Sequence, residues 1–419
     1  MVRETKHTEI GDIPADWEIQ TFEETFRILS NNTLSRENFN NRGGAVRNIH
    51  YGDILTQFTE VLDCCENEIP YVNDLSLLTA STQLLQDGDI VIADTAEDET
   101  VGKVTEVQGI GKDKLVAGLH TIPCRVKKGD FAPGWLGYYM NSNNYHNQIV
   151  PFITGIKVSS ISKTAIAKTL ILIPSLEEQK AISQILSEID LLISAEIKVI
   201  DKIKAVKKGC LSKMFPKNGE FVPEMRLPGF ASDWEQRKFG DIGTVSMCKR
   251  IFKNETSDKG EIPFYKIGTF GGEPDAYISR ELFEEYKGKF SYPNKGDILL
   301  SASGTIGRIV EYDGEEAYFQ DSNIVWLSHD ESVCNKFLKV LYPIIRWDGI
   351  EGSTIQRLYN DNFLKTRFMM PSVEEQEKIG EYFSRLDNLI TLHQRNLEKY
   401  KRIKQGMMSD LLTGKIRLV

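Results

Sequence analysis

The sequence predicts an α+β protein made of two similar halves, each a globular domain followed by a long helix. Three observations lead to this fold class. Short blocks of sequence recur along the 419-residue chain, an apolar heptad stripe follows both copies of one block, and strand-like runs fill the regions between. Hydrophobic residues make up 41% of the chain, which is enough for real cores. We therefore expect two pseudo-symmetric α+β domains joined by two long antiparallel coiled-coil helices.

Internal repetition sets the expected domain boundaries. The block Pro-Ser-x-Glu-Glu-Gln occurs at 174–179 and again at 371–376, Asp-Trp-Glu occurs at 16–18 and 233–235, and Gly-Asp-Ile occurs at 88–90 and 296–298. The spacing between copies differs from block to block because the globular parts differ in length. The expected division is a first globular domain over 1–173, a central long helix over 174–216, a second globular domain over 217–370, and a C-terminal long helix over 371–419.

Each Pro-Ser-x-Glu-Glu block predicts the start of a helix. Ser175 can accept a hydrogen bond from the backbone N–H three residues on, while the side chain of Glu178 reaches back to the N–H of the cap residue. This reciprocal arrangement is a capping box, and Ser372 and Glu375 can form the same one. Ser175, Glu178, Ser372 and Glu375 are therefore predicted helix-start determinants.

Heptad stripes follow both blocks and predict helices roughly 55 to 60 Å long at about 1.5 Å per residue. The first stripe places its a and d positions at Ile182, Ile185, Ile189, Leu192, Val199, Ile203, Val206 and Cys210, with Leu186, Ile193 and Ile200 beside them. The second stripe places them at Ile379, Tyr382, Leu386, Leu389, Tyr400, Ile403 and Met407.

A helix of that length with one apolar stripe needs a partner, and direct repetition lets the two helices pack antiparallel. Glu196 and His393 fall at the same repeat position near the helix centres. They either form a polar layer that sets the register or reach solvent. In both cases we expect His393 to be structural.

The regions before each helix are mixed and rich in short strands. β-branched or aliphatic runs bounded by Gly, Asp or Pro occur at 89–93, 169–173, 297–300, 308–310 and 323–327. Short helices are expected at 135–140 and 336–345. The loops between them are rich in Asn, Ser, Thr and Gly, and such loops on a rigid scaffold often carry recognition residues.

Loops of both halves contain side chains of the kinds that contact DNA. Arg and Lys pair with phosphates or guanine, Gln pairs with adenine, and Ser or Thr pairs with either base. Any one of these is more often an ordinary loop residue, so the prediction depends on the set. The DNA-binding candidates are Arg36, Lys103, Lys157, Ser159 and Lys163 in the first half, and Lys249, Ser303, Thr305, Arg308, Gln356 and Arg357 in the second. The first-half counterpart of the Ser303 loop, 94–99, is acidic and would repel phosphates.

The sequence offers no support for catalysis or for a membrane span. A nucleotide-binding GxxxxGK[ST] motif, an S-adenosylmethionine motif and metal-ligand spacing of His and Cys are all missing, and the six cysteines form no CxxC pair. The longest apolar runs have the length of core strands, and residues 1–10 lack an apolar signal region. A net charge of −9 at pH 7 confines nucleic-acid contacts to local patches. We expect a cytoplasmic protein without catalytic residues, cofactor or metal.

Two alternatives remain open at this point. Pro274-Asp275 followed by Glu285-Tyr286-Lys287 formally matches the pattern of a single-chain magnesium-dependent nuclease. That chemistry requires carboxylates on adjacent strand ends, whereas the pattern at 281–287 predicts a helix. The other alternative is a structural coiled-coil adaptor with no role in nucleic-acid binding.

The repeated motifs resemble the specificity subunit of a type I restriction-modification system. The resemblance is carried by Ile-Pro-Ser-Leu-Glu-Glu-Gln and Met-Pro-Ser-Val-Glu-Glu-Gln, each before a heptad helix, and by Gly-Asp-Ile before a core strand of each half. It covers essentially the whole chain. The loop residues do not contribute to it, because that family varies them to change its target.

The resemblance implies a DNA-reading role in which this chain performs no chemistry. Each globular half would be a target recognition domain that reads one half of a bipartite sequence in double-stranded DNA, and the helices would set the gap between the two halves. The helices would also dock two methyltransferase subunits, which use S-adenosylmethionine and take the target base out of the stack. Restriction subunits, which use ATP and Mg²⁺, would join for cleavage.

Overall fold

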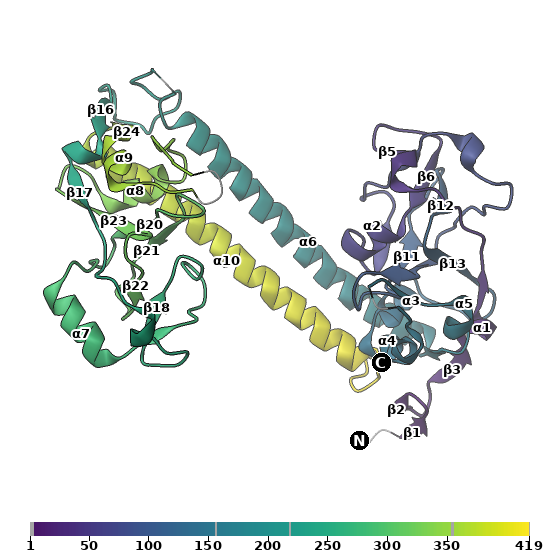
Figure 1. Cartoon of the computed structure of the whole chain (residues 1–419). Helices are drawn as coiled ribbons and strands as arrows, with labels where there is room; N and C mark the ends of the chain where they lie inside the picture. Colours follow the sequence, from purple (N-terminus) through teal and green to yellow (C-terminus); the bar gives the residue numbers. More distant parts are fainter. Residues whose placement is uncertain (1–3, 156, 218, 353–355, 419) are drawn as a thin grey trace. The chain divides into compact units, whose positions relative to one another are not determined.

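The structure is a computed structural model that describes residues 4–155, 157–217, 219–352 and 356–418. The chain forms two compact units. Unit 1 contains Met1–Ile197 and Arg395–Val419, and unit 2 contains Lys198–Gln394. Each unit therefore combines one globular region with parts of both long helices (Figure 1).

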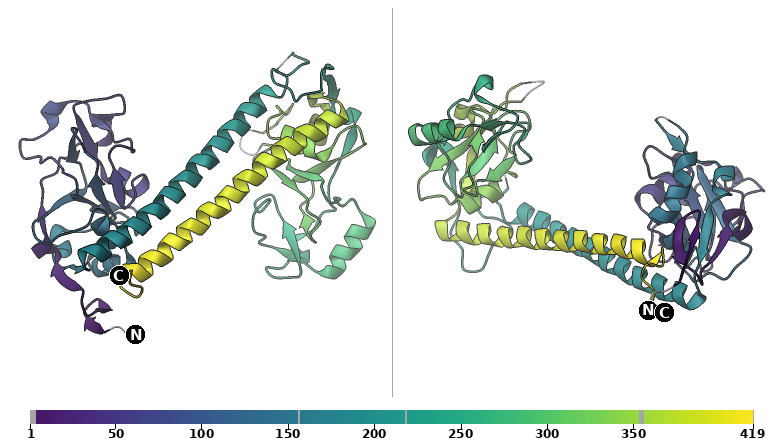
Figure 2. Two further views of the ribbon diagram at one scale, coloured as in Figure 1. Left: turned by 180° about the vertical axis from the view of Figure 1, so that it is seen from behind. Right: turned by 90° about the horizontal axis from the view of Figure 1, so that it is seen from below.

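The long helices are α6 (Leu176–Lys213) and α10 (Val373–Leu411), and both begin directly after a Pro-Ser pair, as the sequence predicts. In unit 1 the start of α6 lies beside the end of α10, where Lys404 Nζ is 2.6 Å from Asp190 Oδ1 (Figure 2). In unit 2 the equivalent contact joins Lys207 to Asp387 at 2.5 Å. The two helices therefore run antiparallel in each unit.

Burial along the helices corrects the predicted heptad frame. Beyond the first heptad of each helix, the second apolar position of a heptad lies four residues after the first rather than three. The residues turned away from solvent are Ile182, Leu186, Ile189, Ile193, Ile200, Ile203 and Cys210 in α6, and Ile379, Phe383, Leu386, Ile390, Leu397, Tyr400 and Leu411 in α10. The predicted positions Ile185, Tyr382 and Met407 are half-buried as well, whereas the predicted positions Leu192, Val199, Val206, Leu389 and Ile403 are exposed. The stripe is wide enough to contain both frames, so its apolar pattern alone did not select between them.

Unit 1 is built on two main sheets. The five-stranded sheet has the order β4-β13-β9-β11-β7, and the four-stranded sheet has the order β12-β6-β8-β5. The strands are β1 (Thr5–Thr8), β2 (Gly11–Pro14), β3 (Glu18–Thr21), β4 (Phe26–Ile28), β5 (Phe39–Asn40), β6 (Val46–Ile49), β7 (Val61–Asp63), β8 (Tyr71–Val72), β9 (Ile90–Ala93), β10 (Thr95–Ala96), β11 (Val104–Gln108), β12 (Lys114–Ala117), β13 (Thr121–Val126), β14 (Ser159–Ser160) and β15 (Leu170–Ile173). The short helices are α1 (Phe22–Thr25), α2 (Tyr51–Thr56), α3 (Trp135–Met140), α4 (Asn143–Ile149) and α5 (Lys163–Ile166).

Unit 2 has a four-stranded sheet of order β17-β23-β20-β21 and a three-stranded sheet of order β19-β18-β22. The strands are β16 (Glu235–Lys238), β17 (Gly243–Ser246), β18 (Ile262–Tyr265), β19 (Tyr277–Ile278), β20 (Ile298–Ser301), β21 (Ile309–Glu311), β22 (Tyr318–Phe319), β23 (Ile324–His329) and β24 (Arg367–Met370). The short helices are α7 (Arg280–Lys289), α8 (Asn335–Leu341) and α9 (Asn360–Lys365).

The two units repeat the same core topology. The order β4-β13-β9-β11 in unit 1 matches β17-β23-β20-β21 in unit 2, and the pair β3-β15 matches β16-β24. Every strand predicted from a β-branched or aliphatic run falls on one of these elements, at β9, β15, β20, β21 and β23. The predicted helices at 135–140 and 336–345 correspond to α3 and α8. The α+β assignment and the pseudo-symmetry of the two halves are confirmed.

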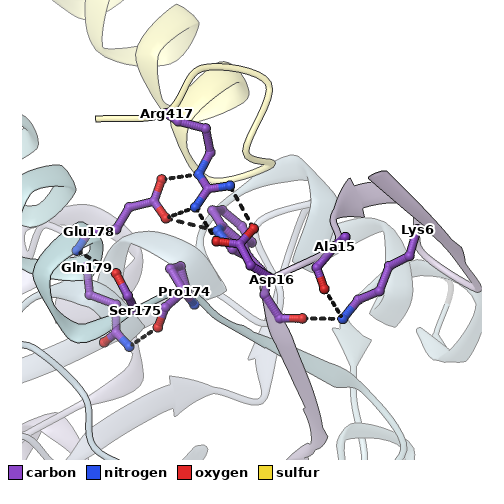
Figure 3. Close-up of polar contacts among 9 residues, drawn as sticks. Lys6, Ala15, Asp16, Pro174, Ser175, Glu178, Gln179 and Arg417 are labelled. Carbon is purple, nitrogen blue, oxygen red and sulfur yellow. Dashed lines mark hydrogen bonds and ion pairs between the residues drawn. The ribbon is translucent and has the colours of Figure 1, made fainter. Parts of the chain in front are cut away.

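The glutamate of each repeated block lies in a buried ion pair. Glu178 is fully buried and its carboxylate accepts hydrogen bonds from Arg417 Nε at 2.5 Å, from Arg417 Nη2 at 2.7 Å and from Trp17 Nε1 at 3.0 Å (Figure 3). Arg417 also donates to Asp16, and the bonds to Asp16 and Glu178 raise the pKa of this arginine. We call this contact the glutamate-arginine clamp of unit 1.

Unit 2 contains the equivalent clamp. Glu375 is buried and accepts from Arg226 Nε and Nη2, both at 2.7 Å, which raises the pKa of Arg226. Arg226 follows the end of α6 and Arg417 follows the end of α10. Each clamp therefore joins the start of one long helix to the segment that leaves the other.

The predicted capping boxes form only in part. Ser175 Oγ accepts from the N–H of Glu178 at 3.2 Å, and Ser372 Oγ accepts from the N–H of Glu375 at 3.4 Å. The two glutamate side chains turn to the clamp arginines instead of back to the cap residue. The physical reason is burial, because a buried carboxylate needs a cationic partner more than a helix N–H group needs a second acceptor.

The glutamine of the block attaches each helix start to its globular region. Gln179 Nε2 donates to the carbonyl of Pro174, and Gln179 Oε1 accepts from the N–H of Ala132, which lies shortly before α3. Gln376 makes the same two kinds of bond, to Pro371 and from Cys334 directly before α8. The repeated Glu-Glu-Gln thus has a structural explanation in both units.

Replacing Arg417 by Met should destabilise unit 1 by about 3–5 kcal/mol, because it leaves the carboxylate of Glu178 buried without its cation. Chemical denaturation followed by tryptophan fluorescence measures the change. The matched control Arg237→Met removes an exposed pair with Glu235 and should cost less than about 1 kcal/mol. Adding Glu178→Gln to Arg417→Met should restore part of the loss. Equal stabilities of the Arg417 and Arg237 variants would contradict the clamp.

Candidate nucleic-acid interface

Three predicted DNA-binding residues of unit 1, Lys157, Ser159 and Lys163, lie where two loops meet at the end of its central strand. The chain leaves β9 and forms β10, which pairs with β14 so that Thr95 lies opposite Ser160 and Ala96 opposite Ser159. The second loop continues into α5, whose first residue is the exposed Lys163. These two loops bring the acidic segment 94–99 beside the segment that carries Lys157 and Ser159.

The same pair of loops exists in unit 2. The chain leaves β20, and Ser303 forms a bridge with Arg357, while the N–H of Gly304 donates to the carbonyl of Gln356 at 2.9 Å. The second loop then leads into α9. The structure therefore places the predicted residues Ser303 and Thr305 beside Gln356 and Arg357, although the two segments lie about fifty positions apart in sequence. We call this arrangement the paired loops of each unit.

Arg36 belongs to the same surface of unit 1 through α2. Its guanidinium pairs with the carboxylate of Asp53 in a bidentate contact at 3.0 and 2.5 Å, and the Asp53 side chain is only 2% exposed. Half of the arginine side chain remains exposed. A buried carboxylate that binds one edge of a guanidinium fixes the direction in which the remaining N–H groups of the guanidinium point.

Aromatic and imidazole rings connect Arg36 to the paired loops. His50 caps α2 by accepting from the N–H of Gly52, and burial together with the nearby Arg36 lowers the pKa of His50. The ring of Tyr51 lies 4.5 Å from that of His50 and 5.2 Å from that of His120. His120 in turn contacts Thr95 at 3.2 Å. A series of ring and side-chain contacts therefore leads from His50, near Arg36, to β10.

Two predicted residues make contacts within the fold. Lys103 is partly buried and its ammonium donates to the carbonyls of Leu55 and Phe58 at 3.2 and 3.0 Å, and burial lowers its pKa. Ser303 is 7% exposed because its backbone is bridged to Arg357. Lys103 thus closes a turn of the fold, and Ser303 is a buried member of the paired loops. Neither role was visible in a sequence that shows only polar loop residues.

The other predicted residues of unit 2 are exposed at different places. Lys249 lies over the ring of Phe290 at 5.2 Å, and Arg308 donates from Nη1 to the carbonyl of Phe270 at 2.9 Å. Arg308 closes the first of the paired loops, since its N–H also donates to Ser301. Arg308 therefore belongs to the paired loops. The segment around Lys249 contacts the turn before β23 instead, through the pair between Arg250 and Asp321 at 2.8 Å.

The residues of the nuclease alternative do not form a metal site. Asp275 pairs with Lys266, and Glu285 pairs with Lys289 one turn along α7. The ammonium of Lys287 lies over the rings of Phe283 and Tyr292. Among the described residues there is no group of three or more His, Cys, Asp or Glu side chains able to hold a metal ion. The helix predicted at 281–287 is α7.

None of the helices in the described part of the chain has the length and apolar character needed to cross a membrane.

Several residues of this surface escaped the sequence analysis. Asp53, Tyr51 and His120 in unit 1 and Asn323 in unit 2 lie among the paired loops or their neighbours, yet none follows a recognisable motif. The repeat of Arg-Leu at 226–227 and 417–418 also escaped notice, although it was visible in the sequence and would have indicated the clamp.

Comparisons with known proteins agree with the repeat. A family described as the type I restriction modification DNA specificity domain matches residues 14–205 and again residues 231–402. A putative type I restriction enzyme specificity subunit of Haemophilus influenzae is 44% identical over 256 residues, which cover 61% of this chain and 64% of that protein. That match therefore spans somewhat less than two thirds of the relative. A putative type I specificity subunit of Methanocaldococcus jannaschii is 26% identical over 99% of this chain and 96% of that protein.

Solved structures are similar in fold. The crystal structure of a type I restriction-modification S subunit from M. genitalium matches with a TM-score of 0.59 at 14% identity, covering 98% of this chain and 99% of that one. A chain from a structure of a type I restriction-modification system matches with a TM-score of 0.55 at 14% identity, covering 96% and 99%. Since the family's domain matches both repeats over most of their residues, this chain belongs to the type I restriction-modification specificity subunit family.

Proposed function

We propose that this chain selects the DNA sequence on which a type I restriction-modification complex acts, and that it performs no chemistry itself. The paired loops of unit 1 read one half of a bipartite target in double-stranded DNA, and the paired loops of unit 2 read the other half. The long helices set the gap between the half-sites. The observation that carries the proposal is the presence of equivalent paired loops, at the end of equivalent central strands, in two units of different loop chemistry.

The chemistry of the loops suits base recognition better than phosphate binding. The loops of unit 1 combine hydroxyls with the carboxylates of 94–99, and carboxylates can accept from the amino group of cytosine. The loops of unit 2 present an amide and a guanidinium at Gln356 and Arg357, which suit adenine and guanine. Two different sets of side chains on one repeated frame predict two different half-sites.

Partners supply what the chain lacks. Apolar side chains on the outer face of the helices, Leu191, Leu192, Val206, Leu389 and Leu392, are 43–70% exposed and offer a surface on which two methyltransferase subunits dock. Those subunits bring S-adenosylmethionine chemistry, and restriction subunits bring ATP- and Mg²⁺-dependent cleavage. Partner contacts also compensate for the net charge of −9, since phosphate neutralisation then does not depend on this chain alone. The complex would act in the cytoplasm.

The test is to produce the chain with its methyltransferase subunit in a host free of other methylation and to map modified bases by single-molecule sequencing. We expect one bipartite target with two short specified half-sites and a gap of constant length. Methylation should require both subunits. Specific cutting of plasmid by this chain alone with Mg²⁺, or absence of sequence-dependent DNA retention by the complex, would overturn the proposal in favour of a nuclease or a structural adaptor.

Arg357→Ala should weaken binding of the complex to its target by about tenfold or more, because a guanidinium contact to a base or phosphate is worth about 1–3 kcal/mol. The loss should concern the half-site read by unit 2. Arg237→Ala is the matched control, since Arg237 is an exposed arginine of the same unit that pairs with Glu235 on β16. Titration of labelled target DNA at fixed salt measures both variants. Equal affinities of the two would contradict the assignment.

A further inference from the structure

We propose that His120 and Asn323 are specificity-determining residues, each reading a base from the same position of its recognition surface. The inference deepens the proposed function and rests on it, because it names the side chains that contact bases in each half-site. Neither residue was a candidate from the sequence. Four observations within the units carry it.

The two residues hold the same place in the repeated backbone. The carbonyl of His120 accepts from the N–H of Asp94 at 3.1 Å, and the carbonyl of Asn323 accepts from the N–H of Ala302 at 2.8 Å. Asp94 directly follows β9, and Ala302 directly follows β20. Each of the two residues also stands immediately before the strand that pairs with that central strand, β13 in unit 1 and β23 in unit 2.

The turn that carries each residue is strained. Among the residues that the structure describes, the non-glycine positions with positive φ are His120, at 55°, and Ser322, at 35°. A side chain in this region is strained, and such conformations persist where the surrounding structure holds them, often at sites of function. Both fall in the same turn of the repeat, so the strain recurs although the sequences of the two turns differ.

The side chain of His120 lies between α2 and the first of the paired loops of unit 1. Its Nδ1 is 3.2 Å from Thr95 Oγ1 and 3.5 Å from Asp94 Oδ1, and Tyr51 contacts its ring edge to face. The side chain is nonetheless 45% exposed. An imidazole held on one side by a hydroxyl, a carboxylate and an aromatic ring keeps one direction, which is what reading a base edge requires.

The side chain of Asn323 occupies the equivalent place in unit 2. Its Oδ1 accepts from Arg357 Nη2 at 3.5 Å, so it lies against the second of the paired loops, and the residue is partly exposed. Carboxamide and imidazole groups can each donate and accept hydrogen bonds, and a carboxamide can pair with adenine through two bonds. One position of a repeated frame therefore carries two different reading groups.

The experiment uses the complex of the full chain with its methyltransferase subunit and maps methylation in variants. His120→Gly removes the imidazole and is free of the left-handed strain, so the turn should keep its shape. We expect discrimination at one base of the first half-site to fall about tenfold or more, with the second half-site and the gap unchanged. Asn323→Ala should produce the same change in the second half-site only.

The matched control is His7→Gly, which removes an exposed histidine of unit 1 whose contact is with Asp12 in the β1-β2 hairpin. It should leave both half-sites unchanged.

A second variant, His120→Asn, keeps hydrogen-bonding capacity and tolerates positive φ. It should change which base is preferred and not merely weaken the discrimination between bases. If His120→Gly and His120→Asn both discriminated bases as the wild type does, the residue would serve only the shape of the turn and the inference would be overturned. The inference would also be overturned if the variants methylated every target less efficiently but to the same extent, with discrimination between bases intact. Failure of the proposed function itself differs from both, because the wild-type complex would then methylate no bipartite target.

Discussion

The glutamate-arginine clamp is the constraint on which each unit depends. A fully buried carboxylate is tolerated only with a cation and further hydrogen bonds, and Glu178 obtains these from Arg417 and Trp17. The two partners lie 239 positions apart, and the arginine leaves the end of one long helix while the glutamate begins the other. Satisfying the charge therefore requires the two helices to run antiparallel. The Glu375 to Arg226 pair imposes the same condition on unit 2.

From the clamp, the repeated contacts continue along the helices and into the globular regions. Gln179 and Gln376 attach each helix start to the segment before α3 or α8. About three turns further along each helix, Asp190 pairs with Lys404 and Asp387 pairs with Lys207. The central strands β9 and β20 then end at the paired loops. Because buried ion pairs and matched strands hold the rest of each unit, the paired loops can differ in sequence. They are acidic at 94–99 in unit 1 and carry the guanidinium of Arg357 in unit 2.

The sequence predicted those parts of the fold that depend on local pattern. Helix starts at Ser175 and Ser372, the central strands and the duplication are all visible in short motifs, because caps, β-branched runs and repeats act over a few residues. The heptad frame was wrong at Leu192, Val199, Val206, Leu389 and Ile403, since an apolar stripe wide enough for a partner helix and a globular domain fits two frames. The role of Glu178 was also missed in part, because its partner lies far away in the sequence. The same limitation applies to the surface residues. The bonds from Lys103 to the carbonyls of Leu55 and Phe58 could not be predicted from local pattern, and His120 and Asn323 gain their places only through strand pairing.

The measurement that tests this account most directly is the gap of the target after one heptad has been removed from both helices together, residues 194–200 from α6 and 391–397 from α10. These segments are equivalent in the repeat, and their removal keeps both clamps and both interhelical ion pairs. Seven residues correspond to about 10 Å of helix and nearly two full turns, so the helix faces keep their orientation. Methylation mapping of the complex should then show the same bases in each half-site with the gap changed by about three base pairs, or no modification at all because no DNA geometry fits. An unchanged gap with full modification would show that something other than the helix pair sets the spacing.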